Sequence, residues 1–372
     1  MSDLNSLLDL GQAVWLDSIS RELIASGELR RLMKSGLRGL TSNPSIFEKA
    51  IGQSEDYAAA LAKAAGEGLD AKGIFERLAL ADIRDAADIL REVYDATSGA
   101  DGFVSLEVSP GLANDTQGTL AEARRLWREV DRPNLMIKVP GTAAGVPAVR
   151  QLISEGINVN ITLLFARAAY ESVAEAWLQG LEARTAANQD IARLASVASF
   201  FVSRIDTAVD GQIDKAQPGA SQGELAALRG RVAIANAKLA YRFYQNLIAS
   251  ERWKKLAARG ARPQRLLWAS TSTKNPAYRD VIYVEELIGP DTVNTLPPAT
   301  LDAFVDHGVA KPRLTQEVEA AERDLAALAR NGIALNAITD YLLEDGIKQF
   351  AASFDKLLAV VAERAKAKAA AH

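Results

Sequence analysis

Short apolar runs alternate with amphipathic, alanine-rich stretches along most of this chain. The runs have the length of buried strands, and the stretches between them repeat apolar residues at helical spacing. Strands are predicted at eight segments, residues 13–17, 39–43, 103–109, 135–139, 157–163, 196–201, 265–270 and 292–296. Eight strand–helix alternations favour an α/β fold of the closed parallel (β/α)8 type, a TIM barrel, over an open doubly wound sheet.

The chain has 372 residues, whereas a plain barrel of this type needs about 250. The additional length falls in helical patterns, which we place in long insertions around 53–100 and 206–262 and in a C-terminal extension around 314–368. The sequence contains no linker-like or low-complexity segment. We therefore expect a single barrel domain over residues 1–372, with additional helices.

Polar residues interrupt the predicted strands at corresponding positions. Lys138 stands within the apolar stretch NLMIKVPGT, and Glu107 stands within FVSLEVS. Side chains alternate across a strand, and the outward face of a barrel packs under apolar helices. These polar residues should therefore point inward near the carboxyl-terminal mouth, where barrel enzymes carry their active sites. The same argument includes Asp17, Ser105, Ser109, Asn158, Asn160 and Thr162.

Each of these residues also has a purely structural explanation. A lysine at a strand end usually reaches solvent, but Lys138 is followed by the apolar Val139-Pro140. Asp17 can cap the next helix, and Asn43 before Pro44 is a common helix entry. Asn160 and Thr162 can form a hydrogen-bonded pair in the core. Glu107, flanked by apolar residues, is hard to explain as a cap.

The composition narrows the chemistry. The chain has no cysteine and only two histidines, His307 and His372, which excludes cysteine nucleophiles, the usual serine–histidine hydrolases and histidine-rich zinc sites. A net charge of −4 argues against an electrostatic nucleic-acid partner. The chain begins without signal-peptide features and has no apolar run of about 18 residues. We expect a cytoplasmic protein that does not associate with membranes.

Imine chemistry fits the remaining side chains. A desolvated lysine can have its pKa lowered by as much as about 3–5 pH units and can then attack a ketone as a neutral amine. Asp17 and Glu107 are candidates for the acid–base steps. Arg204 after the sixth strand, and Ser270, Ser272 and Lys274 after the seventh, offer groups for a phosphate. No glycine-rich nucleotide motif is present, which disfavours nucleotide binding, and imine chemistry needs no metal, so we expect neither a cofactor nor a metal.

Six motifs together resemble transaldolases, and they occur in the same order in the chain: GLTSNPSIFEKAI, DGFVSLEVSP, NLMIKVPGT, GINVNITLLF, ASFFVSRIDTAVD and WASTSTKNP. The resemblance extends from about Trp15 to Pro298 and is strongest to the longer bacterial-type subgroup. It implies a Schiff-base barrel enzyme of the pentose phosphate pathway, a transferase of the pentose shunt. Such enzymes move a dihydroxyacetone unit from sedoheptulose 7-phosphate or fructose 6-phosphate to glyceraldehyde 3-phosphate or erythrose 4-phosphate.

The resemblance also implies a role for each matching residue. Lys138 corresponds to the Schiff-base lysine, Asp17 to the acid–base carboxylate, and Glu107 with Thr162 to the pair that positions a catalytic water. The residues matching substrate contacts are Asn43 and Asn160 for donor hydroxyls, Ser199 and Phe201 for the pocket wall, and Arg204 for phosphate.

One motif departs from the family pattern. WASTSTKNP lacks the arginine that several transaldolases carry in the run Ala-Ser-Phe-Arg, so Ser270, Ser272 and Lys274 would have to share its role. The expected partners are phosphorylated sugars, and both a monomer and a homodimer are compatible with the sequence.

Two alternatives remain at the level of sequence. The first is an aldolase that releases free dihydroxyacetone from fructose 6-phosphate. Related small barrels with that activity carry tyrosine where this chain has Phe201, which favours transfer. The second is a non-catalytic phosphosugar-binding barrel, which would not need a desolvated lysine facing Asp17 and Glu107. A dehydrogenase is disfavoured because the glycine fingerprint is missing.

Overall fold

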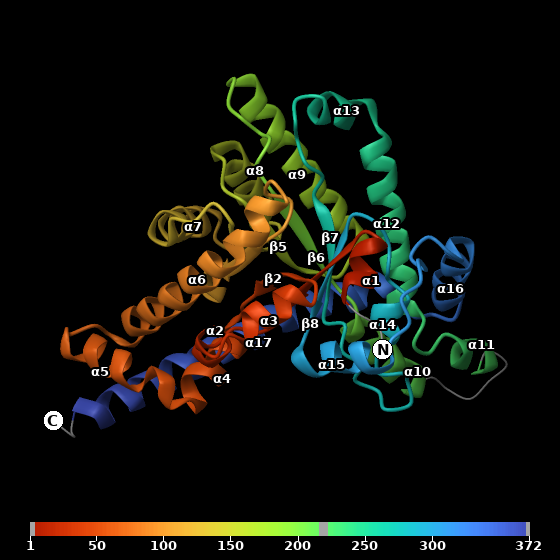
Figure 1. The fold of residues 1–372 in the computed structure, drawn as a ribbon. Helices are drawn as coiled ribbons and strands as arrows, with labels where there is room; N and C mark the ends of the chain where they lie inside the picture. The colour runs from red at the N-terminus through yellow and green to blue at the C-terminus, as the bar shows by residue number, and fades with distance from the viewer. Residues whose placement is uncertain (1–3, 216–221, 370–372) are drawn as a thin grey trace.

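The computed structural model describes residues 4–215 and 222–369, and its centre is a closed barrel of parallel strands (Figure 1). The strands pair in sequence order around the barrel, and the last pairs with the first. They are β1 Gln12–Leu16, β2 Leu37–Thr41, β3 Phe103–Glu107, β4 Leu135–Pro140, β5 Val159–Leu164, β6 Ser196–Phe201, β7 Arg265–Ala269 and β8 Thr292–Leu296. The predicted (β/α)8 barrel is confirmed, and the open doubly wound sheet is wrong.

The register brings the polar strand residues together. Glu107 of β3 lies beside Lys138 of β4, and Lys138 lies beside Asn160 of β5. Pro140 and Thr162 are paired two residues further along the same strands. Because neighbouring residues in register point to the same side of a parallel sheet, side-chain alternation places Glu107, Lys138 and Asn160 on one face.

Strand β5 carries an irregularity at the mouth of the barrel. Its register with β6 shifts between Ile161 and Leu164, and Leu163 has a left-handed backbone with φ of 60°. A leucine in this conformation is strained by about 1–2 kcal/mol, so the surrounding packing must hold it there. The strict alternation predicted for residues 157–163 therefore ends at Thr162.

The helices surround the barrel and extend well beyond it on one side (Figure 1). The α-helices are α1 Leu4–Asp9, α2 Arg21–Ala25, α3 Glu28–Lys34, α4 Pro44–Gln53, α5 Ala58–Gly66, α6 Ala71–Ala96, α7 Thr116–Val130, α8 Gly145–Glu155, α9 Arg167–Ala186, α10 Ser203–Lys215, α11 Gln222–Ala227, α12 Val232–Ala249, α13 Glu251–Ala257, α14 Ile282–Glu285, α15 Pro298–His307, α16 Val318–Arg330 and α17 Leu335–Ala369. Two short 3-10 helices are η1 Glu55–Tyr57 and η2 Pro110–Leu112.

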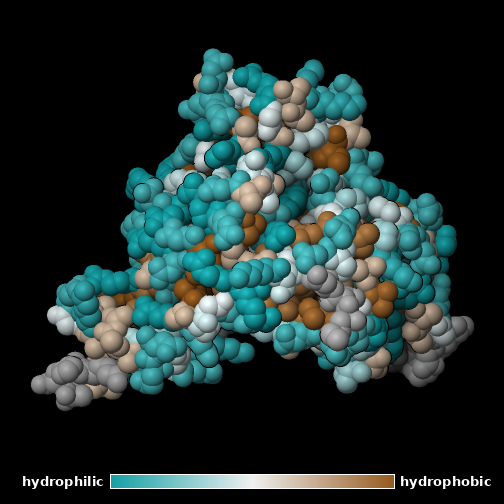
Figure 2. Space-filling view, viewed as in Figure 1, coloured by the Kyte–Doolittle hydropathy of each residue, from teal (hydrophilic) through white to brown (hydrophobic). Residues whose placement is uncertain are grey.

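Side-chain caps explain where several helices begin. Asp70 accepts a hydrogen bond from the backbone of the third residue of α6, and Asp115 does the same for α7. These carboxylates satisfy backbone N–H groups that have no partner within the helix. No described helix is long and apolar enough to cross a bilayer. The face of the molecule in Figure 2 is mostly hydrophilic, with hydrophobic residues showing mainly near its centre.

The long helix α17 crosses from the barrel to the outlying helices. It contacts α10 and β5 near its start and then packs along α4, α5 and α6. Ser353 of α17 bonds to Ser45 of α4 at 2.9 Å, and Lys356 forms an ion pair with Glu48 at 2.8 Å. Phe354 packs edge-on against Phe75 of α6, with ring centroids 5.6 Å apart. The C-terminal helix is thus fixed to α4 and α6, the elements that follow β2 and precede β3.

The amino-terminal end of the barrel is closed by an ion pair. Asp101, just before β3, accepts a hydrogen bond from Arg265 at the start of β7 at 2.9 Å and from the Trp15 indole at 3.4 Å. Strands β3 and β7 are not neighbours, so this contact passes across the base of the barrel. The Trp15 ring also lies 6.1 Å from that of Phe103. These contacts link strands on opposite sides of the barrel at its amino-terminal end.

Asp206 in α10 makes the stability of the fold dependent on pH. Its carboxylate accepts hydrogen bonds from the Ala233 backbone at 2.7 Å and from Tyr283 at 2.8 Å. Burial nevertheless raises the pKa of Asp206 to about 7. Between pH 4 and pH 7 the unfolded chain releases this proton while the folded chain keeps it. Unfolding is therefore favoured as pH rises, with a slope of up to about 1.4 kcal/mol per pH unit from this group.

We expect Asp206→Asn to remove this slope. The wild type should lose stability between pH 4 and pH 7, whereas the variant should not lose it through this group, because an amide does not titrate. The free energy of unfolding of Asp206→Asn minus that of the wild type should therefore rise between pH 4 and pH 7 and level off above that range. Urea unfolding at several pH values measures this difference. Asp214→Asn, on the exposed surface of the same helix, is the control. Wild-type and Asp206→Asn curves that stay parallel over the whole range would contradict the raised pKa.

Candidate active site

A cavity of about 200 Å³ opens at the carboxyl-terminal end of the barrel. The predicted site residues that line it are Asp17, Asn43, Lys138, Thr162, Ser199, Phe201, Arg204, Ser270, Ser272 and Lys274. Glu107 and Asn160 do not line it but contact residues that do. The structure therefore gathers the predicted set from seven different strands or the loops that follow them.

Lys138 is buried, with 6% of its surface exposed, and both of its polar contacts are short. Its ammonium donates a hydrogen bond to the Ser42 carbonyl at 3.0 Å and lies 3.2 Å from a carboxylate oxygen of Glu107. A charge removed from water needs such compensation. The apolar β4 strand can hold an ammonium group because its charge is balanced by a carboxylate from the neighbouring strand.

Two carboxyl groups lie near this one ammonium. Burial raises the pKa of Glu107, and the adjacent Lys138 offsets part of that increase. Burial also raises the pKa of Asp17, with Lys138 and then Lys274 acting in the opposite direction. Both carboxyls therefore take up a proton more readily than in water. Groups with such raised pKa values can act as general acids as well as bases near neutral pH.

Asn160 has its hydrogen bonds satisfied by the protein. Its amide nitrogen donates to Ser105 at 3.0 Å, and its oxygen accepts from the Ser199 hydroxyl at 2.6 Å. The Thr162 hydroxyl is buried and has no hydrogen-bond partner in the described part of the chain. The expected alternative, a pair between Asn160 and Thr162, is therefore wrong. Thr162 instead keeps a free polar group on the cavity wall.

The helix-cap explanations have different outcomes. Asn43 does cap α4, since its oxygen accepts a hydrogen bond from the Ile46 backbone at 2.9 Å and Pro44 follows as the first helical residue. It also lines the cavity, so the capping bond fixes a residue of the site. Asp17 does not cap α2, because Ser20 is the capping residue of that helix.

Part of the cavity wall is cationic and is formed by Arg204 and Lys274. The Arg204 guanidinium lies 5.7 Å from the centroid of the Phe201 ring, and burial lowers the pKa of Arg204. Lys274 is more exposed; partial burial and the nearby Arg204 both lower its pKa. Its ammonium donates to Ser272 at 2.7 Å. Neither cation has an acidic partner within 4 Å among the described residues, which suits the binding of an anion.

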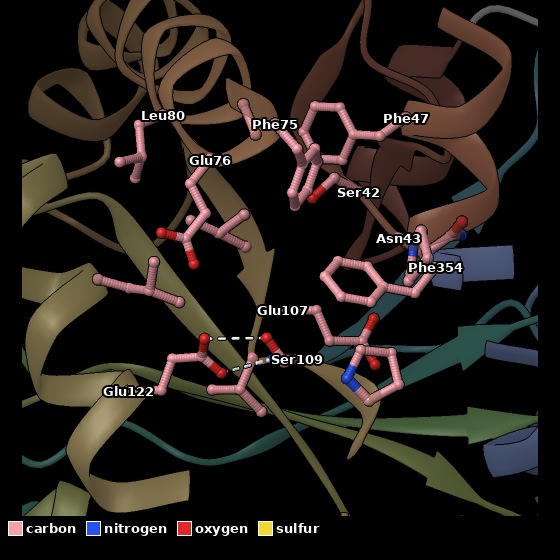
Figure 3. A pocket seen from close by; sticks show the side chains of 16 residues that line it. Ser42, Asn43, Phe47, Phe75, Glu76, Leu80, Glu107, Ser109, Glu122 and Phe354 are labelled. Carbon is pink, nitrogen blue, oxygen red and sulfur yellow. Dashed lines mark hydrogen bonds between the residues drawn. The ribbon is translucent and has the colours of Figure 1, made fainter. Parts of the chain in front are cut away.

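Two residues predicted to point inward near the mouth of the barrel do not lie there. Ser109 lies beyond the end of β3, and its hydroxyl donates to Glu122 of α7 at 2.9 Å, outside the barrel (Figure 3). Asn158 precedes β5 and donates to the backbone of Pro133 and Leu135, at the amino-terminal end of the strands. Alternation applies only within a strand, and both residues lie just outside one.

Sequence reasoning missed six residues of the cavity wall, which are Thr41, Leu267, Ala269, Thr295, Pro297 and Phe350. Thr41 precedes Asn43 in the same strand-end segment, and alternation from Asn43 along β2 would have found it. Phe350 comes from α17. In the sequence Phe350 is one of several apolar residues at helical spacing, so only the path of α17 identifies it.

No group of three or more histidine, cysteine or acidic side chains suited to a metal ion occurs among residues 4–215 and 222–369. Polar groups in the site come instead from one lysine, two carboxyls, hydroxyls and two further cations. A barrel with a lysine–carboxylate pair buried at its mouth is the arrangement of a Schiff-base aldolase-type enzyme.

Comparison with known proteins gives the family. Residues 14–361 match the model of the family described as transaldolase/fructose-6-phosphate aldolase. The chain is 50% identical over 366 residues to "Transaldolase 2" of Nostoc sp., covering 95% of this chain and 96% of that protein. It is 49% identical to transaldolases of Trichodesmium erythraeum, covering 97% and 98%, and of Thiobacillus denitrificans, covering 95% and 97%. The chain belongs to the transaldolase family, as its motifs predicted.

Proposed function

We propose that this transaldolase works through an imine on Lys138, transferring a dihydroxyacetone unit from sedoheptulose 7-phosphate or fructose 6-phosphate to glyceraldehyde 3-phosphate or erythrose 4-phosphate. The observation that carries this mechanism is the position of the Lys138 ammonium, 3.2 Å from Glu107 inside the barrel mouth. A proton can pass between the two groups at that distance, which leaves a neutral amine and a neutral carboxylic acid.

The first step forms the imine. The Lys138 amine adds to the ketone carbon of the donor, and the resulting carbinolamine carries the former carbonyl oxygen as a hydroxyl group. Glu107 gives its proton to this hydroxyl, the C–O bond breaks, and water leaves. The products are a protonated imine and the Glu107 carboxylate, so the charges of the resting ion pair are restored. The unpaired Thr162 hydroxyl is suited to hold the departing water.

The second step breaks the C3–C4 bond of the donor. Asp17 accepts the proton of the C4 hydroxyl, and the electrons of the C3–C4 bond move into the protonated imine to give an enamine. Its raised pKa makes Asp17 a stronger base than an ordinary aspartate. Reversal of these steps with a second aldehyde forms the new bond and releases the product ketose. Asn43 and Ser199 are proposed to bind the hydroxyls of the three-carbon unit, and Asn160 is proposed to contribute through the Ser199 hydroxyl, which it holds at 2.6 Å.

Arg204 and Lys274 are proposed to bind the phosphate of either sugar, together with Ser270 and Ser272. A phosphate dianion would relieve the repulsion that contributes to the low pKa of Lys274. Ser270 has a left-handed backbone, with φ of 56°, and its hydroxyl lies 3.0 Å from that of Ser203 in α10. This strained turn joins the loops after β6 and β7, which provide the two cations.

The proposed partners are phosphorylated sugars alone, not nucleic acid or membranes. The net charge of −4 and the presence of Arg204 and Lys274 inside the cavity support this. A monomer and a homodimer are both compatible with a cavity whose lining residues come from one chain. We place the enzyme in the cytoplasm, where sugar phosphates are made and consumed.

Borohydride trapping tests the proposal. The protein is incubated with fructose 6-phosphate and reduced, and the modified peptide is located by mass. We expect a three-carbon or six-carbon adduct on Lys138, and an unmodified Lys138 would refute the mechanism. Erythrose 4-phosphate is then added to separate the two reactions that the family name covers. Glyceraldehyde 3-phosphate formed only with the acceptor indicates transfer, whereas free dihydroxyacetone formed without it indicates the aldolase.

A further inference from the structure

The motif ASFFVSRIDTAVD contains two aspartates, Asp206 and Asp210, to which the proposed reaction gives no role. They lie one turn apart on α10, the helix whose second residue is Arg204. Each accepts a hydrogen bond from a tyrosine that follows β7. Asp206 accepts from Tyr283 at 2.8 Å, and Asp210 accepts from Tyr278. Both carboxylates therefore attach the segment between β7 and β8 to the helix that carries one of the two cavity cations.

Tyr278 fits a slot that is formed by α10 and by the turn before α12. Its hydroxyl donates to Asp210, which is 8% exposed, and the other oxygen of that carboxylate is buried without a hydrogen-bond partner among the described residues. Its ring lies against Gly230, where a Cβ would be 3.0 Å from the ring and the backbone φ is 70°. Glycine permits both the close contact and the left-handed backbone. Two separate elements thus hold the hydroxyl and the ring of Tyr278.

Lys274 lies within the loop that Tyr278 attaches to α10. Before it, the Thr273 hydroxyl donates to two backbone carbonyls at the end of the loop, at 2.9 and 3.2 Å. After it, the Asn275 carbonyl accepts a hydrogen bond from the backbone of Tyr278 at 3.1 Å. These bonds close residues 273–280 on themselves. The contact of Tyr278 with α10 therefore helps to set the position of the whole unit, including its lysine.

This attachment holds two groups of like charge near each other. Arg204 of α10 and Lys274 of the loop both line the substrate cavity. Burial, followed by the positive charge of Arg204, lowers the pKa of Lys274. Before a phosphate binds, the repulsion between the two cations favours displacement of the loop from α10. Cations that are already in place bind an anion more tightly, because less ordering is needed on binding.

We propose that Tyr278 is a positioning residue for the phosphate of the substrate, and that its bond to Asp210 keeps the cation of Lys274 in place before the sugar arrives. The inference rests on the proposed function, in which Lys274 and Arg204 bind this phosphate. Tyr278 does not line the substrate cavity, so it acts through the loop and not on the sugar. Its loss should weaken the binding of phosphate and leave imine formation on Lys138 unchanged.

Tyr278→Phe tests the proposal, because it removes the hydroxyl and keeps the ring that packs on Gly230. We expect KM for fructose 6-phosphate to rise at least about threefold, with kcat close to that of the wild type. The inhibition constant of inorganic phosphate against this substrate should rise by a similar factor. Dihydroxyacetone has no phosphate, so borohydride should trap it on Lys138 as fast as in the wild type. A residue that only supports the fold would affect both ligands alike.

Tyr283→Phe is the matched control, because it removes the same kind of bond to α10 one turn earlier, at Asp206. Tyr283 lies in α14 and is 1% exposed, so this variant should lose stability but keep the wild-type KM. Asp210→Ala should raise KM as Tyr278→Phe does. The double variant should be no worse than either single one, because both changes remove the same bond.

Lys274→Met separates this inference from the proposed function. If Lys274 binds phosphate, KM for fructose 6-phosphate should rise about tenfold or more in this variant. If KM rises in Lys274→Met but stays at the wild-type value in a folded Tyr278→Phe, the positioning role is overturned. An equal rise in Tyr283→Phe and Tyr278→Phe would also overturn it, since general support of the fold would then be the cause. An unchanged KM in Lys274→Met would instead refute the phosphate role of Lys274, and the inference with it.

Discussion

Lys138→Met is expected to lower transfer activity by about 10⁴-fold or more, because no other amine can form the imine at this position. Methionine has a similar length and fills the same apolar space in β4. It leaves the Glu107 carboxylate buried without a counter-charge, which is unfavourable unless that carboxyl is protonated. Removing the lysine should therefore raise the pKa of Glu107 further, and the variant should be less stable at high pH than at low pH. Steady-state rates and urea unfolding at two pH values measure both effects.

The chain offers a matched control for this substitution. Lys238 in α12 is also buried, with 4% of its surface exposed, and pairs with Glu286 at 3.4 Å, between α12 and α14. Lys238→Met should lower the stability of the fold in a similar way but leave the rate of transfer within a few-fold of the wild type. Substantial activity in Lys138→Met, with the fold intact, would mean that the enzyme does not use this imine.

The strands could be predicted because a strand that is buried on both faces consists mainly of apolar residues. Two predicted segments, 196–201 and 292–296, coincide with β6 and β8. Alternation within the strands then placed Glu107, Lys138 and Asn160 on one side, and the parallel register brought them next to one another. Inward direction and position along the strand are local properties, so the centre of the site could be inferred from sequence alone.

The outer parts of the site depend on contacts between distant segments. Phe350 reaches the cavity only because α17 is fixed across α4 and α6, and helical spacing does not reveal which neighbour a helix meets. Gly346 shows how close this approach is, since a Cβ there would lie 3.0 Å from the side chain of Leu163. Leu163 is also the residue whose left-handed backbone interrupts β5. Neither the bulge nor the helix that covers it has a signature in the strand pattern.

The position of Glu107 relative to Lys138 likewise depends on the pairing of two strands. The sequence indicated Glu107 because a carboxylate interrupts an apolar run, but only the register of β3 with β4 shows that this carboxylate lies 3.2 Å from the Lys138 ammonium. That contact is the basis for proposing that Glu107 acts on the water of imine formation rather than on the hydroxyls of the sugar.

Glu107→Gln is expected to lower kcat by about 10²–10⁴-fold, the usual contribution of a general acid. Glutamine keeps the size and a hydrogen-bonding group near Lys138 but cannot supply the proton that lets water leave the carbinolamine. The slow step should then be imine formation, so the rate of borohydride trapping with fructose 6-phosphate should fall in parallel with kcat. Binding of the phosphate should change little, because Glu107 does not line the cavity to which Arg204 and Lys274 belong.

Asp82→Asn is the control for loss of a buried carboxylate. Asp82 of α6 is 1% exposed and bonds to Arg21 at 3.0 Å and to Tyr57 at 2.7 Å, outside the substrate cavity. Its substitution should lower stability without slowing the trapping of Lys138. If Glu107→Gln were trapped as fast as the wild type while kcat fell, Glu107 would act after imine formation, in the cleavage step. Asp17 would then be left as the carboxyl that releases water, because it is the other acidic side chain that acts electrostatically on Lys138.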